Sequence, residues 1–175
     1  MRRDPIHRAH HHRELTFRAI YAQSEQYMLS LSHDEVVHGK GSLLQKMFGH
    51  SPEQKAAELR LLYAWMYAQP GKKLLFMGSE FGQLTEWNHD AQLPWHVLDT
   101  ARQEGAVHST LLDFMKTLNI LYKKTPALHE EDFSARGFEW VCADDQAQSV
   151  VAFLRWDSAR RAPMLAIFNF TPMMR

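Results

Sequence analysis

The chain has 175 residues, of which 45% are hydrophobic and 23% are charged, a composition typical of a globular protein. Its 20 basic and 20 acidic residues balance, so the net charge favours neither nucleic acid nor an anionic membrane as a partner. The start of the chain is not an apolar signal segment, no apolar run approaches the roughly 20 residues of a membrane span, and Cys142 has no second cysteine to pair with, which together predict a cytoplasmic protein without disulfides.

The first part of the chain predicts a helix followed by a strand. Residues 10–22 favour a helix, although their apolar spacing is only partly regular. Residues 27–32 are short and mainly apolar, which is typical of a buried strand. A loop is expected to begin at His33.

A second helix has clear signals at both ends. Ser51 suits the N-cap, Pro52 suits the first turn, and Gln54 lies three residues after Ser51, as in a capping box. Pro70-Gly71 supplies the stop. Between these signals the apolar residues recur at helical spacing: Leu59, Leu62, Tyr63 and Met66.

The next segments repeat this order. Residues 73–77 predict a second short apolar strand, which also ends in a polar loop. The loop, from Gly78 to about Gly105, contains Trp87 and Trp95, which could stack on sugar rings or fasten the loop to the body; the composition favours fastening. A further helix is expected over 107–123, ending at Thr125-Pro126.

The last part of the chain predicts strands separated by polar turns. Residues 137–143, 149–156 and 164–170 carry this pattern. They indicate the start of a separate antiparallel β unit. Three strands are few for a free-standing sandwich.

The alternation of helix and strand indicates an α/β fold built from βα units. A complete (β/α)8 barrel takes about 250 residues, so we expect residues 1–126 to be the last part of a TIM barrel, with about two strands and three helices. Residues 127–175 are expected to begin an antiparallel C-terminal β-sandwich domain. In such barrels, functional groups follow the carboxyl ends of the strands, where both polar clusters of this chain lie.

The cluster of His33, Asp34 and Glu35 is the leading candidate for a site. An imidazole and carboxylates at a strand end can accept hydrogen bonds from sugar hydroxyls, bind a metal, or stabilise a cationic transition state. From the residues alone, a structural pair that caps a loop is the favoured interpretation of His33 and Asp34. Glu80, after the second strand, is interpreted in the same way as a loop-fixing acid.

A metal-dependent phosphohydrolase is one alternative, because the chain contains 11 histidines. His7 and His11 fit the i, i+4 spacing of metal ligands once, but three consecutive histidines rarely form one metal site. No metal and no cofactor are therefore expected. The histidines concerned are His7, His10, His11, His12, His33 and His89.

Several motifs in the same order resemble the glycogen branching enzymes of bacteria. They include Leu-Ser-His-Asp-Glu-Val-Val-His-Gly-Lys at 31–40, Gly-Lys-Lys-Leu-Leu-Phe-Met-Gly-Ser-Glu-Phe at 71–81 and Glu-Trp-Asn-His-Asp at 86–90. The resemblance extends over nearly the whole chain. Its further segments are Asp4-Pro5, His11-His12, Leu15-Thr16-Phe17, Gly137-Phe138-Glu139-Trp140 and Asn169-Phe170-Thr171-Pro172.

This resemblance implies the chemistry of the retaining α-amylase clan. The family cleaves an α-1,4-glucan, holds it as a covalent glycosyl intermediate and transfers it to a 6-hydroxyl. By this resemblance Asp34 is the third acidic residue of the site, which stabilises the transition state, and His33 is a substrate-binding residue. Glu35 receives no role. The implied partner is an α-glucan such as glycogen or amylose, and the full-length protein is expected to be a monomer.

The nucleophile and the general acid of that family lie on earlier barrel strands than the His33-Asp34 strand. We therefore expect them to precede Met1, so that the chain is a C-terminal fragment which alone does not catalyse. A non-catalytic glucan-binding piece is then an alternative for the 175 residues themselves.

Overall fold

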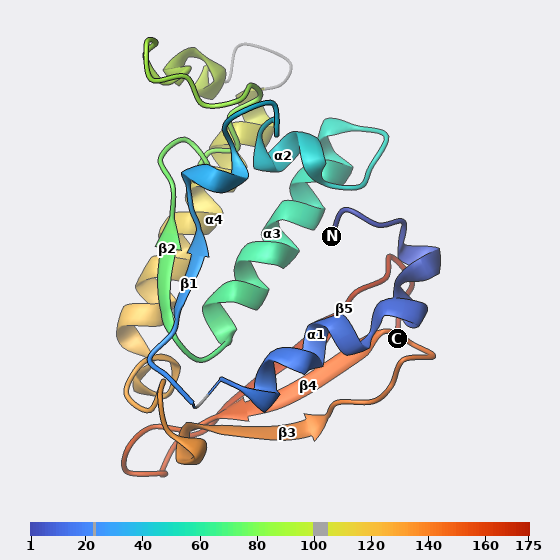
Figure 1. The fold of residues 1–175 in the computed structure, drawn as a ribbon, viewed down its shortest axis with the longest axis vertical. Helices are drawn as coiled ribbons and strands as arrows, with labels where there is room; N and C mark the ends of the chain where they lie inside the picture. Colours follow the sequence, from blue (N-terminus) through green and yellow to red (C-terminus); the bar gives the residue numbers. More distant parts are fainter. Residues whose placement is uncertain (23, 100–104) are drawn as a thin grey trace. The chain divides into compact units, whose positions relative to one another are not determined.

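The computed structural model describes residues 1–22, 24–99 and 105–175 (Figure 1). It combines helices and strands, which confirms the α/β class. No helix in these described ranges is long and apolar enough to span a membrane. The elements are α1 (Arg13–Thr16), β1 (Met28–Leu31), α2 (Leu43–Lys46), α3 (Pro52–Ala68), β2 (Lys72–Leu75), α4 (Gly105–Lys124), β3 (Phe138–Cys142), β4 (Val150–Arg155) and β5 (Met164–Asn169).

The chain divides into two compact units, which are described one at a time. The first unit comprises residues 1–2, 30–63 and 74–120. The second unit comprises residues 3–29, 64–73 and 121–175. Each unit is therefore assembled from segments that are distant in sequence.

The two short strands predicted before polar loops are present and form a two-stranded sheet. Their arrows point the same way in Figure 1. β1 falls within the predicted 27–32, whereas β2 begins one residue earlier than predicted and ends at Leu75. Phe76 and Met77 lie beyond β2, but the Phe76 N–H still donates to the Leu31 carbonyl at 2.9 Å. The two strands therefore end at the same level.

The predicted N-terminus of α3 is confirmed, with one difference in its cap. The Ser51 hydroxyl accepts from the Gln54 N–H at 3.3 Å. The Gln54 side chain accepts from the N–H of His50 at 2.8 Å rather than from Ser51. The reciprocal cap thus reaches one residue further back than in a capping box.

A capping box does occur at the short helix α2, which the sequence reasoning missed. The Ser42 side chain accepts from the Gln45 N–H, and the Gln45 side chain accepts from the Ser42 N–H. Leu43 and Leu44 are buried behind it. The signal was the Ser-x-x-Gln spacing at 42–45 before two leucines.

The core of the first unit lies between α3, α4 and the polar segment that follows β2. Leu59, Tyr63, Phe81 and Leu111 are all fully buried. Buried His108 of α4 shares a 2.9 Å hydrogen bond with the Phe81 carbonyl. This packing confirms the predicted helix at 107–123 and holds the start of the polar segment against it.

The prediction of one continuous helix over 10–22 is wrong. The structure has 3-10 helices at Pro5–His11 and Phe17–Ile20 with the four-residue α1 between them. The reason is that no apolar stripe forms, because Phe17 and Ile20 are exposed. Instead two buried polar side chains bind backbone carbonyls: Arg8 binds that of Phe170 at 2.8 Å and His12 that of Ala143 at 2.9 Å.

The three predicted C-terminal strands are confirmed as one antiparallel sheet of order β3-β4-β5. Val151 and Phe153 face the core of the second unit and are fully buried. Trp65 packs edge-on against three rings of the sheet: Phe153, Phe168 and Phe170. Aromatic packing of this kind adds to the burial of apolar area.

A buried ion pair joins the sheet of the second unit to its loops. Arg155 of β4 donates to Asp132 at 2.8 Å, and both side chains are at most 1% exposed. The same guanidinium donates to the carbonyls of Ala68 and Gly137. Lys72 donates to the second oxygen of Asp132 at 3.0 Å. Every oxygen of this carboxylate is thus hydrogen-bonded.

Removing the negative charge should destabilise the second unit strongly. In Asp132→Asn, the Arg155 guanidinium stays buried without a counter-ion, which should lower the free energy of unfolding by about 3–5 kcal/mol. Urea unfolding followed by tryptophan fluorescence measures this loss.

The matched control is Asp113→Asn on α4, where the Lys116–Asp113 pair is exposed. An exposed pair contributes about 0–1 kcal/mol, so the control should unfold nearly as the parent does. Equal losses in the two variants would contradict a special role for the buried pair.

Candidate functional site

The end of β1 presents the predicted cluster on a single capped turn. His33–Glu35 form a 3-10 turn whose N-cap is Ser32. The Ser32 hydroxyl accepts from the Asp34 N–H and donates to the Asp34 carboxylate, both at 3.2 Å. This local capping explains why the chain leaves the strand at Ser32 and turns Asp34 outward.

The His33 and Asp34 side chains lie beside each other and are open to solvent. The imidazole Nε2 and the nearer Asp34 oxygen are 3.5 Å apart, and the side chains are 58% and 71% exposed. Glu35 is half-buried, and its backbone carbonyl accepts from the Lys46 ammonium group. Glu35 thus differs from His33 and Asp34, because it is less exposed to solvent.

Buried residues hold this turn in place. Val36 and Val37 follow it directly and are 1% and 7% exposed. The Val36 carbonyl accepts from the Trp87 N–H at 2.9 Å. Apolar burial and one long-range hydrogen bond thus fix the backbone next to the two exposed candidate side chains.

An open hollow of about 580 Å³ is lined by His33 of this pair, whereas Asp34 is not among its described lining residues. Its aromatic wall consists of Trp87, which packs edge-on against Phe76, while Phe76 also contacts the His33 ring. A planar wall next to hydrogen-bonding groups suits a sugar ring. The hollow is lined by His33, Val37, His38, Thr85, Glu86, Trp87, Asn88 and His89.

One lining residue, Glu86, ties two loops together. Its two carboxylate oxygens accept from the N–H groups of Gly39 and Gly41, each at 3.0 Å. These hydrogen bonds lower the pKa of Glu86. Gly39, Gly41 and His38 all have positive φ angles, the left-handed conformation that favours glycine.

Lys40, between the two glycines, reaches back to the candidate pair. Its ammonium group donates to the Asp34 backbone carbonyl at 2.5 Å. Sequence reasoning gave Glu86 and Lys40 no role. The Gly-Lys-Gly spacing at 39–41 was the visible signal, but its carboxylate partner lies 45 residues or more further along the chain.

The two tryptophans of the long loop both contact rings of the body. Trp87 is half-buried against Phe76. Trp95 packs against buried Phe81 with ring centroids 5.0 Å apart, but remains 54% exposed. Only Trp87 lines the hollow described above. Part of the predicted loop, residues 100–104, lies outside the described residues.

The histidines do not gather into a metal centre in the part of the chain that the structure describes, where no three His, Cys, Asp or Glu side chains could hold one ion. His11 instead contacts Glu14 at 2.9 Å. His89 pairs with the neighbouring Asp90 at 3.2 Å in a separate exposed pair. The geometry therefore lends the phosphohydrolase alternative no support.

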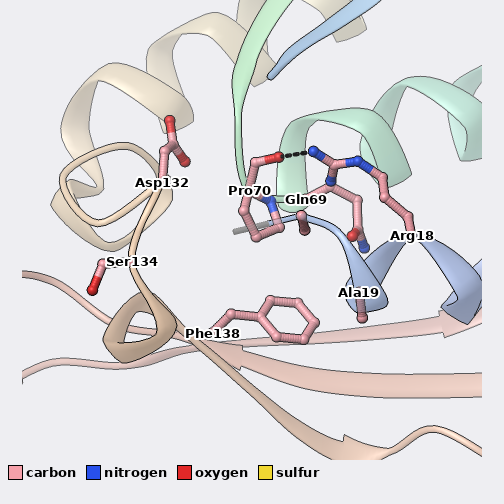
Figure 2. A pocket seen from close by; sticks show the side chains of 8 residues that line it. Arg18, Ala19, Gln69, Pro70, Asp132, Ser134 and Phe138 are labelled. Carbon is pink, nitrogen blue, oxygen red and sulfur yellow. Dashed lines mark hydrogen bonds between the residues drawn. The ribbon is translucent and has the colours of Figure 1, made fainter. Parts of the chain in front are cut away.

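A second cavity, in the second unit, is too small to be the site. Its volume is about 20 Å³, room for about one water molecule. Figure 2 shows Arg18 and Asp132 at its rim, with the Arg18 guanidinium donating to the Pro70 carbonyl at 2.8 Å. The hollow lined by His33 is the better candidate for a bulky ligand.

The arrangement in the first unit can bind a neutral, hydroxyl-rich ligand. Asp34 offers carboxylate oxygens as hydrogen-bond acceptors and a negative charge opposite a developing cation. His33 offers ring nitrogens to hydroxyl groups. Trp87 offers an apolar ring beside them.

No protein-family model matches the chain. Curated relatives match it along its whole length. A 1,4-alpha-glucan branching enzyme of Ralstonia nicotianae is 55% identical over 175 residues, which is 100% of this chain and 22% of the relative. That of Xanthomonas campestris pv. campestris is 54% identical over 98% of this chain and 23% of the relative.

A third relative agrees with these two. The 1,4-alpha-glucan branching enzyme of Roseobacter denitrificans is 51% identical over 100% of this chain and 23% of the relative. The chain thus spans less than a quarter of the length of the relatives it matches. The chain is therefore similar, along its whole length, to one segment of these 1,4-alpha-glucan branching enzymes.

Proposed function

We propose that this chain contributes the His33–Asp34 part of a branching-enzyme active site, which cleaves an α-1,4-glucan and transfers it to a 6-hydroxyl. The proposal rests on the placement of this exposed pair at the end of β1, where His33 lines a hollow with an aromatic wall, in a chain 55% identical to such an enzyme. The substrate is then an α-glucan such as glycogen or amylose.

In this proposal Asp34 is the catalytic residue of the segment. Glycoside cleavage with retention passes through an oxocarbenium-like transition state, whose positive charge a carboxylate stabilises. His33 binds substrate hydroxyl groups. The nucleophile and the general acid, which retaining chemistry places about 5–5.5 Å apart, come from the part of the enzyme that this segment does not cover.

We further propose that residues 1–126 are the last part of a (β/α)8 barrel and that residues 127–175 begin a β-sandwich domain. The barrel is supported by the parallel course of β1 and β2 (Figure 1), whose polar loops follow the same ends. The sandwich is supported by the outer sheet face, where Val141, Leu165 and Ile167 are 53–64% exposed. A second sheet would bury this face.

A non-catalytic glucan-binding role is the second candidate for the 175 residues by themselves. The exposure of His33 and Asp34 favours it, because an open carboxylate can bind hydroxyls but does not by itself exclude water from a reaction. The two candidates make different predictions for a complete enzyme that contains this segment. Asp34 is needed for branching in the first and only for glucan binding in the second. The proposal also takes the full-length protein to be a cytoplasmic monomer.

Neutralising Asp34 should remove most activity from a complete enzyme. The suitable protein is the Ralstonia nicotianae branching enzyme in which this chain replaces the matching segment. In it, Asp34→Asn should lower kcat for amylose branching by about 100-fold or more, because the charge acts in the transition state. An iodine-colour assay with product debranching measures the rate.

The thermal unfolding midpoint should not fall, because Asp34 is exposed. Asp113→Asn, which removes an exposed carboxylate on α4, is the control and should branch normally. Near-normal turnover by the Asp34→Asn enzyme would refute the catalytic role.

The 175-residue chain alone should not branch amylose, since the proposal takes the nucleophile and the general acid from outside it. Incubation with amylose, followed by debranching and chain-length analysis, should give the same profile as the untreated polymer. New α-1,6 linkages formed by the purified chain would show that it carries a complete set of catalytic carboxylates.

A further inference from the structure

Glu86 is the only carboxylate among the residues described as lining the hollow, yet its oxygens point at backbone rather than at open solvent. Both oxygens accept from glycine N–H groups, those of Gly39 and Gly41. Hydrogen bonds from N–H groups to an ionised carboxylate are roughly twice as strong as neutral ones. Glu86 is thus engaged in holding the loop of residues 38–41.

This loop carries the contact that reaches the proposed catalytic residue. Lys40 lies between the two glycines, and its ammonium group donates to the Asp34 carbonyl. The residue after Glu86 adds a second tether, because the Trp87 N–H donates to the Val36 carbonyl. The segment of Glu86 and Trp87 therefore restrains the backbone directly after the turn that bears Asp34, and through Lys40 also the Asp34 carbonyl within it.

The backbone of the loop is shaped to bind an anion. Its left-handed conformation at His38, Gly39 and Gly41 directs the N–H groups of the two glycines toward the Glu86 carboxylate. A side chain at Gly41 would come within 2.9 Å of the Gln45 amide oxygen, which itself caps α2. The two glycine N–H groups would otherwise face water, so the Glu86 carboxylate fixes one loop conformation.

We propose that Glu86 is a positioning residue for Asp34, acting through the loop of residues 38–41 and the Lys40 ammonium group. This inference rests on the proposed function, because positioning matters only if Asp34 takes part in the reaction. Glu86 itself does not touch the reacting atoms. Its effect is to keep the Asp34 carboxylate within the small range of positions that a transition state requires.

The test uses the Ralstonia nicotianae enzyme that carries this chain as its matching segment. Glu86→Gln keeps the side-chain shape but turns an amide NH2 toward one glycine N–H, so that at least one hydrogen bond is lost. The value of kcat for amylose branching should fall about 10- to 100-fold. KM should change much less, because the loss is in the transition state.

Glu130→Gln is the matched control. The Glu130 carboxylate also accepts a backbone N–H, that of Ser158 at 3.0 Å, and it belongs to the second unit and does not line the hollow. It should lower the unfolding midpoint about as much as Glu86→Gln does while leaving kcat unchanged. If both variants keep the parent kcat, the positioning role is wrong.

A double-mutant cycle tests the route through Lys40. Lys40→Met removes the ammonium group that donates to Asp34 but keeps most of the side-chain stem. If Glu86 and Lys40 act along one path, the double variant should be little slower than the slower single variant. If the fold-decreases in kcat of the two single variants multiply in the double variant, the two residues act independently and the proposed route is wrong. Lys40→Met also supplies a result if Glu86→Gln does not fold.

The pH dependence tests whether the tether acts through the ionised Glu86 carboxylate. Hydrogen bonds from Gly39 and Gly41 lower the pKa of Glu86 in the folded state below its ordinary value. The tether is therefore complete above the ordinary carboxyl pKa of about 4.3 and is lost only as pH falls through the lower, folded-state pKa. The ratio of parent to Glu86→Gln kcat should stay constant from pH 5 to 8.

Two failures can be told apart. If the enzyme carrying the parent chain does not branch amylose, or if Asp34→Asn in it is fully active, the proposed function fails. If that enzyme branches amylose and Asp34→Asn is inactive, but Glu86→Gln matches Glu130→Gln in kcat, only the positioning role fails.

Discussion

The hydrogen bond from the Phe76 N–H to the Leu31 carbonyl fixes where the two short strands β1 and β2 end. Because β1 and β2 stop at the same level, the loops that follow them begin next to each other. His33 on one loop and Trp87 on the other thereby come close together, since Phe76 contacts both rings. The candidate site is a consequence of strand pairing at this one point.

The site combines exposed side chains with a restrained backbone. The carboxylate and imidazole of the pair face solvent, as hydrogen bonding to a large ligand requires. Burial of Val36, just after the pair, stabilises the backbone at this point. Hydrogen bonds of Glu86 with Gly39 and of Trp87 with Val36 fix the adjoining loop. The backbone is thus ordered before a ligand binds, and binding restricts only the rotamers of His33 and Asp34.

The second unit obtains its order from different interactions. Buried cations bind backbone carbonyls there: Arg155 of β4 binds that of Ala68, and Arg8 of the N-terminal 3-10 helix binds that of Phe170. A guanidinium group offers five donors in a fixed fork, so it can satisfy several carbonyls that no regular element would pair. This explains how an N-terminal segment without a continuous apolar stripe remains packed.

The sequence by itself determined the elements with local signals and the similarity to branching enzymes. Ser51 and Pro52 set the start of α3, periodicity set α4 and the three C-terminal strands, and the motif around His33-Asp34 named the leading site residues. Local rules suffice there because the partners lie within a few residues.

Only the tertiary structure decided which loops share the hollow, that Glu86 binds the glycine loop, and that the N-terminal segment breaks into short helices. These depend on contacts across 45 residues or more, such as Glu86 with Gly41 and Arg8 with Phe170. Periodicity and capping describe a chain's immediate neighbours. They carry no information on which distant carbonyl or N–H a side chain will find when the strands pair.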